Sequence, residues 1–178
     1  MQEIILVNEL DEELGSMGKM EAHEKALLHR AFSVFLFDKK GNMLLQKRAA
    51  GKYHSPSLWT NACCSHPMPG ETTTQAALRR LQEELGFTTP IRKAFHFTYK
   101  AVFGNGLTEH EFDHVFAGEY EGEMKLNAAE VSDTCYKSMA EIKKEIEINP
   151  QSYTEWFKIA FPLVEAWMQH QNKKPVEA

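Results

Sequence analysis

The sequence has few cysteines, no long apolar run and no surplus of basic residues. Only three of its 178 residues are cysteines, and two of them, Cys63 and Cys64, are adjacent in the chain. Adjacent cysteines rarely bond to each other, because disulfide geometry needs more separation than neighbouring extended residues provide. We therefore expect no disulfide framework, and a reducing compartment such as the cytoplasm fits this composition better.

Targeting signals and membrane-spanning segments are also missing. The amino terminus has no basic stretch followed by an apolar run, and no apolar segment is long enough to span a bilayer. The formal net charge of -5 argues against general nucleic-acid binding, which normally needs a basic surplus, whereas a small anion needs only a local basic pocket. We expect a monomeric cytoplasmic protein that binds neither membranes nor nucleic acids.

The pattern of strands and helices predicts a single domain over residues 1–178, with a polar tail at about 171–178. Strands are expected at 4–7, 31–37, 43–46, 94–102 and 112–120, with an acidic turn ending near residue 15 and a loop at 49–69. A short helical or irregular segment is expected at 20–28, and helices at 72–86, 139–147 and 154–169. Since no regular βαβ repeat is present, we predict an α/β or α+β fold in which helices sandwich a mixed β-sheet.

The clearest helix carries arginines and carboxylates along one edge. Arg79 lies four residues before Glu83, and Arg80 lies four residues before Glu84, which is the spacing of helical ion pairs. Such an edge suits a diphosphate bridged by Mg²⁺, because carboxylates bind the metal and guanidinium groups bind phosphate oxygens. A solvent-exposed face of salt bridges is the commoner use of this pattern.

The loop before this helix contains a cysteine close to a histidine, in the segment Trp-Thr-Asn-Ala-Cys-Cys-Ser-His-Pro at 59–67. Cys64 and His66 could be a nucleophile and its base, a metal-binding pair, or a buried thiol beside an ordinary loop histidine. Buried thiols are the most frequent of these three, because free cysteine is among the most buried residue types.

Carboxylates and histidines form two further clusters. Glu109 and Glu111 alternate along a predicted strand, so their side chains face the same side of it. Pairs of this kind are usually exposed, but they could also bind a metal or carry a proton. The spacing of His23 and His29 is weak evidence by itself.

The helix resembles the Nudix box, G-x5-E-x7-R-E-U-x-E-E-x-G-U, in which U is an apolar residue. Seven positions are in register: Glu71, Arg79, Leu81, Glu83, Glu84, Gly86 and Phe87. Ser65 stands where the box has its first Gly, and Arg80 stands where it has the Glu that follows Arg. Nudix hydrolases use that group of glutamates to bind metal and activate water. The resemblance therefore implies the Nudix fold, while the charge reversal at Arg80 disfavours hydrolysis.

Over about residues 19–156 the sequence resembles type I isopentenyl diphosphate isomerase, a family with the Nudix fold. The matching segments are 29–33, 44–49, 59–67, the helix with Arg79 and Arg80, and 109–111. The segment Trp-Thr-Asn…Cys-x-His-Pro is more specific than the Nudix box. The resemblance implies an enzyme of isoprenoid biosynthesis that converts isopentenyl diphosphate to dimethylallyl diphosphate by adding one proton and removing another.

The same resemblance implies the roles of individual residues. Cys64 and Glu111 would handle the protons, and Tyr99 would orient Glu111 or relay a proton. One divalent metal, Mn²⁺, Mg²⁺ or Zn²⁺, would be bound by His23, His29, His66, Glu109 and Glu111. A Mg²⁺ on the diphosphate would be held by Glu84 and the main-chain carbonyl of Cys64. The diphosphate would be bound by Lys19, Arg48, Lys52 and Arg80, and Trp156 would stabilise a carbocation.

Two other functions agree with parts of the pattern. A Nudix hydrolase would cleave diphosphates of nucleosides or other groups, although Arg80 and the pair formed by Cys64 and Glu111 disfavour it. A non-catalytic protein that binds a metal or a diphosphate would keep its activity without Cys64.

Overall fold

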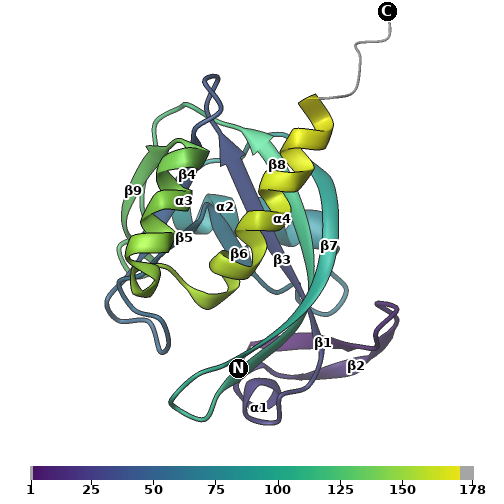
Figure 1. The fold of residues 1–178 in the computed structure, drawn as a ribbon. Coiled ribbons are helices and arrows are strands. Elements are labelled where there is room, and N and C mark those ends of the chain that lie inside the picture. The colour runs from purple at the N-terminus through teal and green to yellow at the C-terminus, as the bar shows by residue number, and fades with distance from the viewer. Residues whose placement is uncertain (1, 173–178) are drawn as a thin grey trace, which may run out of the picture.

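The computed structural model describes residues 2–172, which form one β-sheet and the helices that cover it (Figure 1). The strands are β1 (Glu3–Val7), β2 (Glu13–Gly18), β3 (His29–Phe37), β4 (Met43–Arg48), β5 (Trp59–Asn61), β6 (Cys63–Ser65), β7 (Ile91–Val102), β8 (Thr108–Glu119) and β9 (Val131–Lys137). The helices are α1 (Lys19–Glu24), α2 (Thr73–Leu85), α3 (Met139–Ile148) and α4 (Glu155–Asn172), with a 3₁₀ turn at Pro150–Ser152. No helix within residues 2–172 is both long and apolar enough to cross a membrane.

The strand β3 is the centre of the sheet. It runs parallel to β8 along its whole length, from the pair His29 and Glu111 to the pair Phe37 and Glu119. Its other edge carries the antiparallel strand β6, in which Cys64 pairs with Ser33. β7 pairs antiparallel with β8, and β4 pairs antiparallel with β5 and β9. The parallel pair among antiparallel ones confirms the prediction of a mixed sheet.

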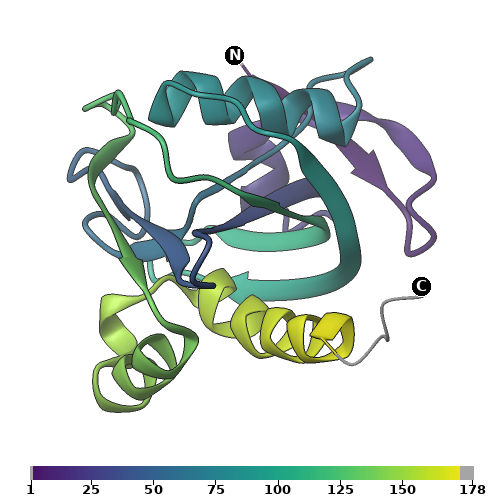
Figure 2. The same cartoon turned by 90° about the horizontal axis from the view of Figure 1, so that it is seen from above.

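Helices cover both faces of this sheet, as Figure 2 shows for α2 on one side and α4 on the other. Side chains of β3 alternate between the two faces, so Val34 packs in the core beneath α2 and Phe35 in the core beneath α4. The adjacent cysteines divide in the same way: Cys63 lies in the α2 core and Cys64 packs against the α4 core. The sandwich of a single α+β domain is therefore confirmed.

The helix α2 forms where the sequence predicts it. The hydroxyl of Thr72 accepts a hydrogen bond from the main-chain N–H of Gln75, and the Gln75 side chain accepts one from the N–H of Thr72. At the other end Gly86 adopts a φ of 78°, and a Cβ there would lie 2.7 Å from Lys125. Only glycine avoids both the strain and the clash, so the helix ends at this position.

Some elements differ from the prediction. The expected acidic turn is present but ends at Glu12 instead of near residue 15, because the strand β2 begins at Glu13, and the expected loop at 49–69 contains β5 and β6. β9 was not anticipated. β5 and β6 have only three residues each, too few to show an alternating pattern, and pairing with β4 and β3 makes them strands.

The predicted boundaries also need two corrections near helices. Within the expected segment 20–28 the helical part is α1, which ends at Glu24. α4 continues to Asn172, so the first two residues of the expected polar tail are helical, and 173–178 lie outside the described residues.

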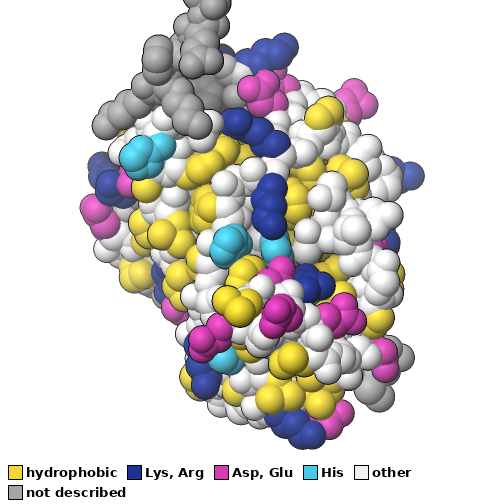
Figure 3. All heavy atoms as spheres, turned by 90° about the vertical axis from the view of Figure 1, so that its right-hand side faces the viewer, with side chains coloured by type: hydrophobic (Ala, Val, Ile, Leu, Met, Phe, Trp, Pro, Cys, Tyr) yellow, Lys and Arg dark blue, Asp and Glu magenta, His cyan; other side chains and the backbone are white. Residues whose placement is uncertain are grey.

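A cluster of polar contacts fixes the β1–β2 hairpin to the sheet. The Asp11 carboxylate accepts a hydrogen bond from Arg30 Nε at 2.7 Å and lies 2.9 Å from His114 Nε2. The main-chain carbonyl of Asp11 accepts another from Arg30 Nη2 at 2.7 Å. On the face drawn in Figure 3, acidic, basic and histidine side chains stand close together in the middle of the molecule. α1 follows this hairpin, so the cluster also fixes Lys19 and His23 relative to β3 and β8.

Candidate active site

The structure gathers most of the residues singled out in the sequence around one pocket. The pocket is lined by residues of α1, α2, α4 and four strands. The lining residues that were predicted above as site residues are Lys19, Arg48, Lys52, Cys64, His66, Arg80, Glu84, Tyr99, Glu109, Glu111 and Trp156. His23 and His29 are fully buried and lie against His66, with ring centroids 5.6 and 4.9 Å from it. Residues from segments far apart in the chain thus meet at one place.

Three imidazoles and one carboxylate form a compact cluster. The side-chain nitrogen or oxygen atoms that His23, His29, His66 and Glu111 offer lie within 4.8 Å of one another. His66 Nε2 lies 2.9 Å from Glu111 Oε1 and 3.2 Å from His29 Nε2. All four residues are buried. This mixed nitrogen and oxygen set is suited to a divalent metal ion.

Main-chain carbonyls orient two of these imidazoles. His23 Nδ1 lies 2.7 Å from the carbonyl oxygen of Lys19, and His29 Nδ1 lies 2.8 Å from that of Leu27. A proton on each Nδ1 leaves both Nε2 atoms as acceptors that face the cluster. His23 Nε2 is buried and has no hydrogen-bond partner among residues 2–172. A buried nitrogen of this kind is costly unless it binds something, so the cluster fits a metal ion.

Burial keeps these histidines in the form that binds metals. It lowers the pKa of His23 to about 4, with a further contribution from His29. It also lowers the pKa of His66 to about 3, although Glu111 opposes the shift. Both rings are therefore neutral at physiological pH, as coordination requires.

The two carboxylates of β8 share one hydroxyl but differ in their surroundings. The hydroxyl of Tyr99 lies 2.9 Å from Glu109 Oε2 and 2.8 Å from Glu111 Oε2. Burial and the charge of Glu111 raise the pKa of Glu109 well above its usual value. Burial acts in the same direction on Glu111, but His66 and His29 outweigh it and hold its pKa well below the usual value. Glu111 is therefore the ionised member of the pair.

The predicted metal ligand Glu109 lies outside the compact imidazole cluster. The histidine beside it is His54, whose Nε2 is 3.4 Å from Glu109 Oε1. Its role as a fifth ligand stays a prediction.

Cys64 lies on β6, on the side of the sheet that carries the pocket. Burial raises the pKa of its thiol well above the usual value, although the guanidinium of Arg48 opposes this shift. The side chain is therefore a thiol rather than a thiolate at neutral pH. Glu111 comes from β8, so these two residues flank β3 from opposite edges.

Cations line the same pocket. Lys52 Nζ lies 2.5 Å from Glu130, and Arg80 Nη2 lies 2.6 Å from Glu84 and 3.4 Å from Glu130. Burial lowers the pKa of Lys19, although the nearby carboxylates oppose this effect. These groups provide the local basic pocket expected in an otherwise acidic protein.

Arg48 is held by the loop that follows it. Its Nη2 and Nε donate to the main-chain carbonyls of His54 and Ser55 at 3.1 and 3.2 Å. Its guanidinium also lies 5.1 Å from the ring centroid of Trp156. The arginine and the aromatic ring therefore form one unit of the pocket wall.

Glu130, His54 and Gln46 are among the pocket residues that received no role from the sequence. Glu130 bridges two of the cations, and His54 contacts Glu109. Gln46 donates to Glu84 at 2.9 Å and to the carbonyl of Ala62 at 2.7 Å. His54 and Glu130 lie outside regular elements, and Gln46 is one polar residue in a buried strand. No local periodicity identifies any of them.

Comparisons with known proteins agree with this arrangement. A family model described as the NUDIX domain matches residues 27–157. The chain is 47% identical over 171 residues to isopentenyl-diphosphate Delta-isomerase 2 of Photorhabdus laumondii, with 93% of this chain and 97% of that protein covered. It is 48% identical over 154 residues to isopentenyl-diphosphate Delta-isomerase 2 of Aromatoleum aromaticum, covering 86% and 82%.

Solved structures resemble the fold at lower sequence identity. A protein of Deinococcus radiodurans superposes with a TM-score of 0.73 at 19% identity, covering 89% of this chain and 96% of that one. The MutT protein from Methanosarcina mazei superposes with a TM-score of 0.64 at 19% identity, covering 83% and 96%. At this identity the likeness shows the fold alone.

Proposed function

The chain belongs to the isopentenyl-diphosphate Delta-isomerase family, which has the NUDIX domain, and we propose how its pocket carries out that reaction. The protein is an isomerase that converts isopentenyl diphosphate to dimethylallyl diphosphate. The observation that carries the proposed mechanism is that Cys64 and Glu111 line the same pocket beside a cluster of three imidazoles.

Isomerisation moves a double bond by adding a proton at one carbon and removing a proton from another. It needs one acid and one base that reach different carbons of the same substrate. Cys64 as a thiol and Glu111 as a carboxylate together hold one transferable proton, which is the number that the reaction requires. Tyr99 donates its hydroxyl proton toward Glu111 and so orients that carboxylate.

His23, His29, His66 and Glu111 would hold a divalent ion, which we propose is Mn²⁺ or Mg²⁺, with Glu109 as a further ligand. When bound, the ion supplies positive charge that stabilises the ionised form of its carboxylate ligands. Glu84 and the carbonyl of Cys64, both at the pocket, would hold a Mg²⁺ that accompanies the diphosphate. Gln46 and Arg80 fix the two oxygens of Glu84.

Trp156 is proposed to face the carbocation formed by protonation of the alkene. The residue is 3% exposed, and a desolvated aromatic face attracts a cation by roughly 2 kcal/mol or more. Arg48 lies over this ring in the structure, and we propose that it turns toward the diphosphate when substrate binds. A cationic substrate centre could then occupy the space beside the ring, shielded from water.

The diphosphate is proposed to bind Lys19, Arg48, Lys52 and Arg80, in competition with Glu130. This carboxylate neutralises Lys52 and Arg80 in the substrate-free pocket. We expect Glu130→Gln to lower KM for isopentenyl diphosphate by about threefold to tenfold, since removal of a competing ion pair is worth about 1 kcal/mol. Steady-state kinetics tests this, with Glu147→Gln on α3 as the control. A higher KM in Glu130→Gln would show instead that Glu130 holds the cations in place.

Hydrolysis of a diphosphate is the main competing function. In the Nudix box Arg80 occupies the place of a glutamate, and in the structure it binds Glu83 at 2.7 Å and Glu84 at 2.6 Å. The carboxylates of α2 are therefore paired with a guanidinium, which disfavours a cluster of glutamates around a hydrolytic metal.

Proton NMR of the purified protein with isopentenyl diphosphate and Mg²⁺ in D₂O tests the proposed function. We expect the methyl signals of dimethylallyl diphosphate to appear and deuterium to enter the product. Release of phosphate would identify a hydrolase. If the substrate stays unchanged although the protein is shown to bind metal, the result would favour a non-catalytic protein that binds a metal or a diphosphate. We further propose that the protein acts as a monomer in the cytoplasm, where its cysteines stay reduced.

A further inference from the structure

His54 forms part of the pocket wall through its ring. The residue is 7% exposed, and its ring stacks on Phe103 with centroids 4.8 Å apart and an interplanar angle of 18°. The ring meets Trp156 edge-on, at 5.6 Å and 88°, and meets Tyr53 edge-on at 4.4 Å and 89°. Three aromatic neighbours thus fix its orientation, and it in turn limits the position of Trp156.

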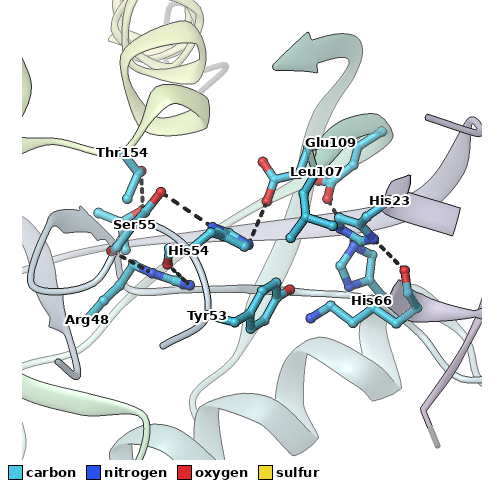
Figure 4. Close-up of polar contacts among 12 residues, drawn as sticks. His23, Arg48, Tyr53, His54, Ser55, His66, Leu107, Glu109 and Thr154 are labelled. Carbon is cyan, nitrogen blue, oxygen red and sulfur yellow. Dashed lines mark hydrogen bonds and ion pairs between the residues drawn. The ribbon is translucent and has the colours of Figure 1, made fainter. Parts of the chain in front are cut away.

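The two nitrogens of this ring face polar groups, as Figure 4 shows. Nδ1 lies 3.4 Å from Ser55 Oγ, and Nε2 lies 3.4 Å from Glu109 Oε1. A neutral imidazole has one N–H, and Nε2 is the ring nitrogen that faces the carboxyl group of Glu109. The Ser55 hydroxyl can donate to Nδ1, which fixes that tautomer.

The main chain of His54 contributes independently of the ring. Its carbonyl oxygen accepts the hydrogen bond from Arg48 Nη2, and Arg48 covers the ring of Trp156. Substitution of the side chain leaves this carbonyl in place. Effects of the imidazole can therefore be separated from effects on Arg48.

We propose that His54 is a positioning residue of the isomerase, whose ring holds Trp156 and whose Nε2–H holds Glu109. The inference rests on the proposed function, in which Trp156 faces the carbocation and Glu109 binds the metal. Because His54 acts through these two groups, its loss lowers kcat and metal affinity more than it raises KM. A residue that orients a metal ligand typically contributes about 10-fold to 100-fold to metal affinity or activity.

Three variants separate the two contacts. His54→Phe keeps the ring and loses the N–H, His54→Gln keeps an N–H donor and loses the ring, and His54→Ala loses both. The control is His170→Gln, at an exposed position of α4. The readouts are kcat and KM for isopentenyl diphosphate, Mn²⁺ affinity from the electron paramagnetic resonance of free Mn²⁺, and circular dichroism.

We expect His54→Ala to lower kcat by about 10-fold to 100-fold with KM within about threefold of wild type. His54→Phe should weaken Mn²⁺ binding by about 10-fold, whereas His54→Gln should keep Mn²⁺ affinity and lose kcat. The control should match wild type. The proposal is overturned if all three variants match wild type, or if His54→Phe and His54→Gln bind Mn²⁺ equally. Wild-type turnover tests the isomerase function separately, because the Mn²⁺ comparison does not depend on it.

Discussion

Cys64→Ala is expected to lower kcat for isopentenyl diphosphate by about 10²-fold to 10⁴-fold, which is the contribution of proton transfer by a positioned side chain. The substitution removes the sulfur that carries the proton at the β6 edge of β3 and leaves the backbone unchanged. Glu111 lies across β3 and cannot take over, because one group cannot serve both carbons of the substrate. Methyl signals of the product in the NMR assay measure the loss.

The same variant should keep its fold and its metal. The thiol of Cys64 is not a member of the imidazole cluster, so Mn²⁺ affinity should stay within about threefold of wild type. Cys135→Ala is the matched control, because Cys135 is a half-buried cysteine on β9 that does not line the pocket. It should keep normal turnover. A normal isomerase rate in Cys64→Ala would reject the role of Cys64.

Local signals in the sequence predicted the elements that depend on local interactions. α2 has a capping box at Thr72, a regular apolar repeat and a stop at Gly86, and each of these acts within a few residues. The strands β5 and β6 have no such signal, because three residues show no period and their partners are distant in sequence. Pairing with the rest of the sheet determines their structure, and a single sequence does not reveal that pairing.

The site was predicted in its residue types but not in its geometry. Alternation along a strand placed Glu109 and Glu111 on one face, and their shared contact with Tyr99 confirms this. Alternation did not distinguish them, yet only Glu111 enters the imidazole cluster. That difference arises because β8 runs parallel to β3 with Glu111 opposite His29. These two residues are 82 positions apart in the sequence, so their pairing is determined by the folded chain and not by a local pattern.

Residues that support the site were the hardest to predict. Glu130 and His54 match no motif and belong to irregular segments, so neither composition nor spacing separates them from ordinary surface residues. Their contacts arise only when Lys52, Arg80 and Glu109 are brought to the same pocket.

Lowering the pH from 7 to 5 is expected to destabilise the metal-free protein by about 3 kcal/mol, on the scale of about 1.4 kcal/mol for each pKa unit. The cause is a set of buried histidines. Burial lowers the pKa of His23 and His114 to about 4, and that of His54 and His66 to about 3. Protonation of these rings is therefore much easier in the unfolded chain.

Stability falls on acidification because the unfolded chain binds more protons than the folded protein at pH values between the folded and unfolded pKa of these histidines. Below the unfolded pKa of about 6.5 the unfolded chain takes up a proton at each histidine and the folded protein does not, so stability falls with pH. At pH 5 this amounts to about 2 kcal/mol for each of the four rings.

Two buried acids act in the opposite direction. Burial and Glu111 raise the pKa of Glu109 well above its usual value and that of Asp113 to about 8. Acidification relieves their cost by at most about 5 kcal/mol together, because each acid takes up at most one proton over these two pH units, and a smaller net loss remains.

Urea unfolding of the chelator-treated protein at pH 7, 6 and 5 measures this loss. His114 provides the internal test, because it lies outside the metal cluster and its pKa depends on burial and Lys93. His114→Gln removes one titrating ring, so the fall in stability between pH 7 and 5 should shrink by about 2 kcal/mol. Saturating Mn²⁺ should steepen the fall, because protons must then displace the metal from His23 and His66. A free energy of unfolding that stays constant from pH 7 to 5, unaffected by His114→Gln, would show that these histidines are solvated rather than buried and neutral.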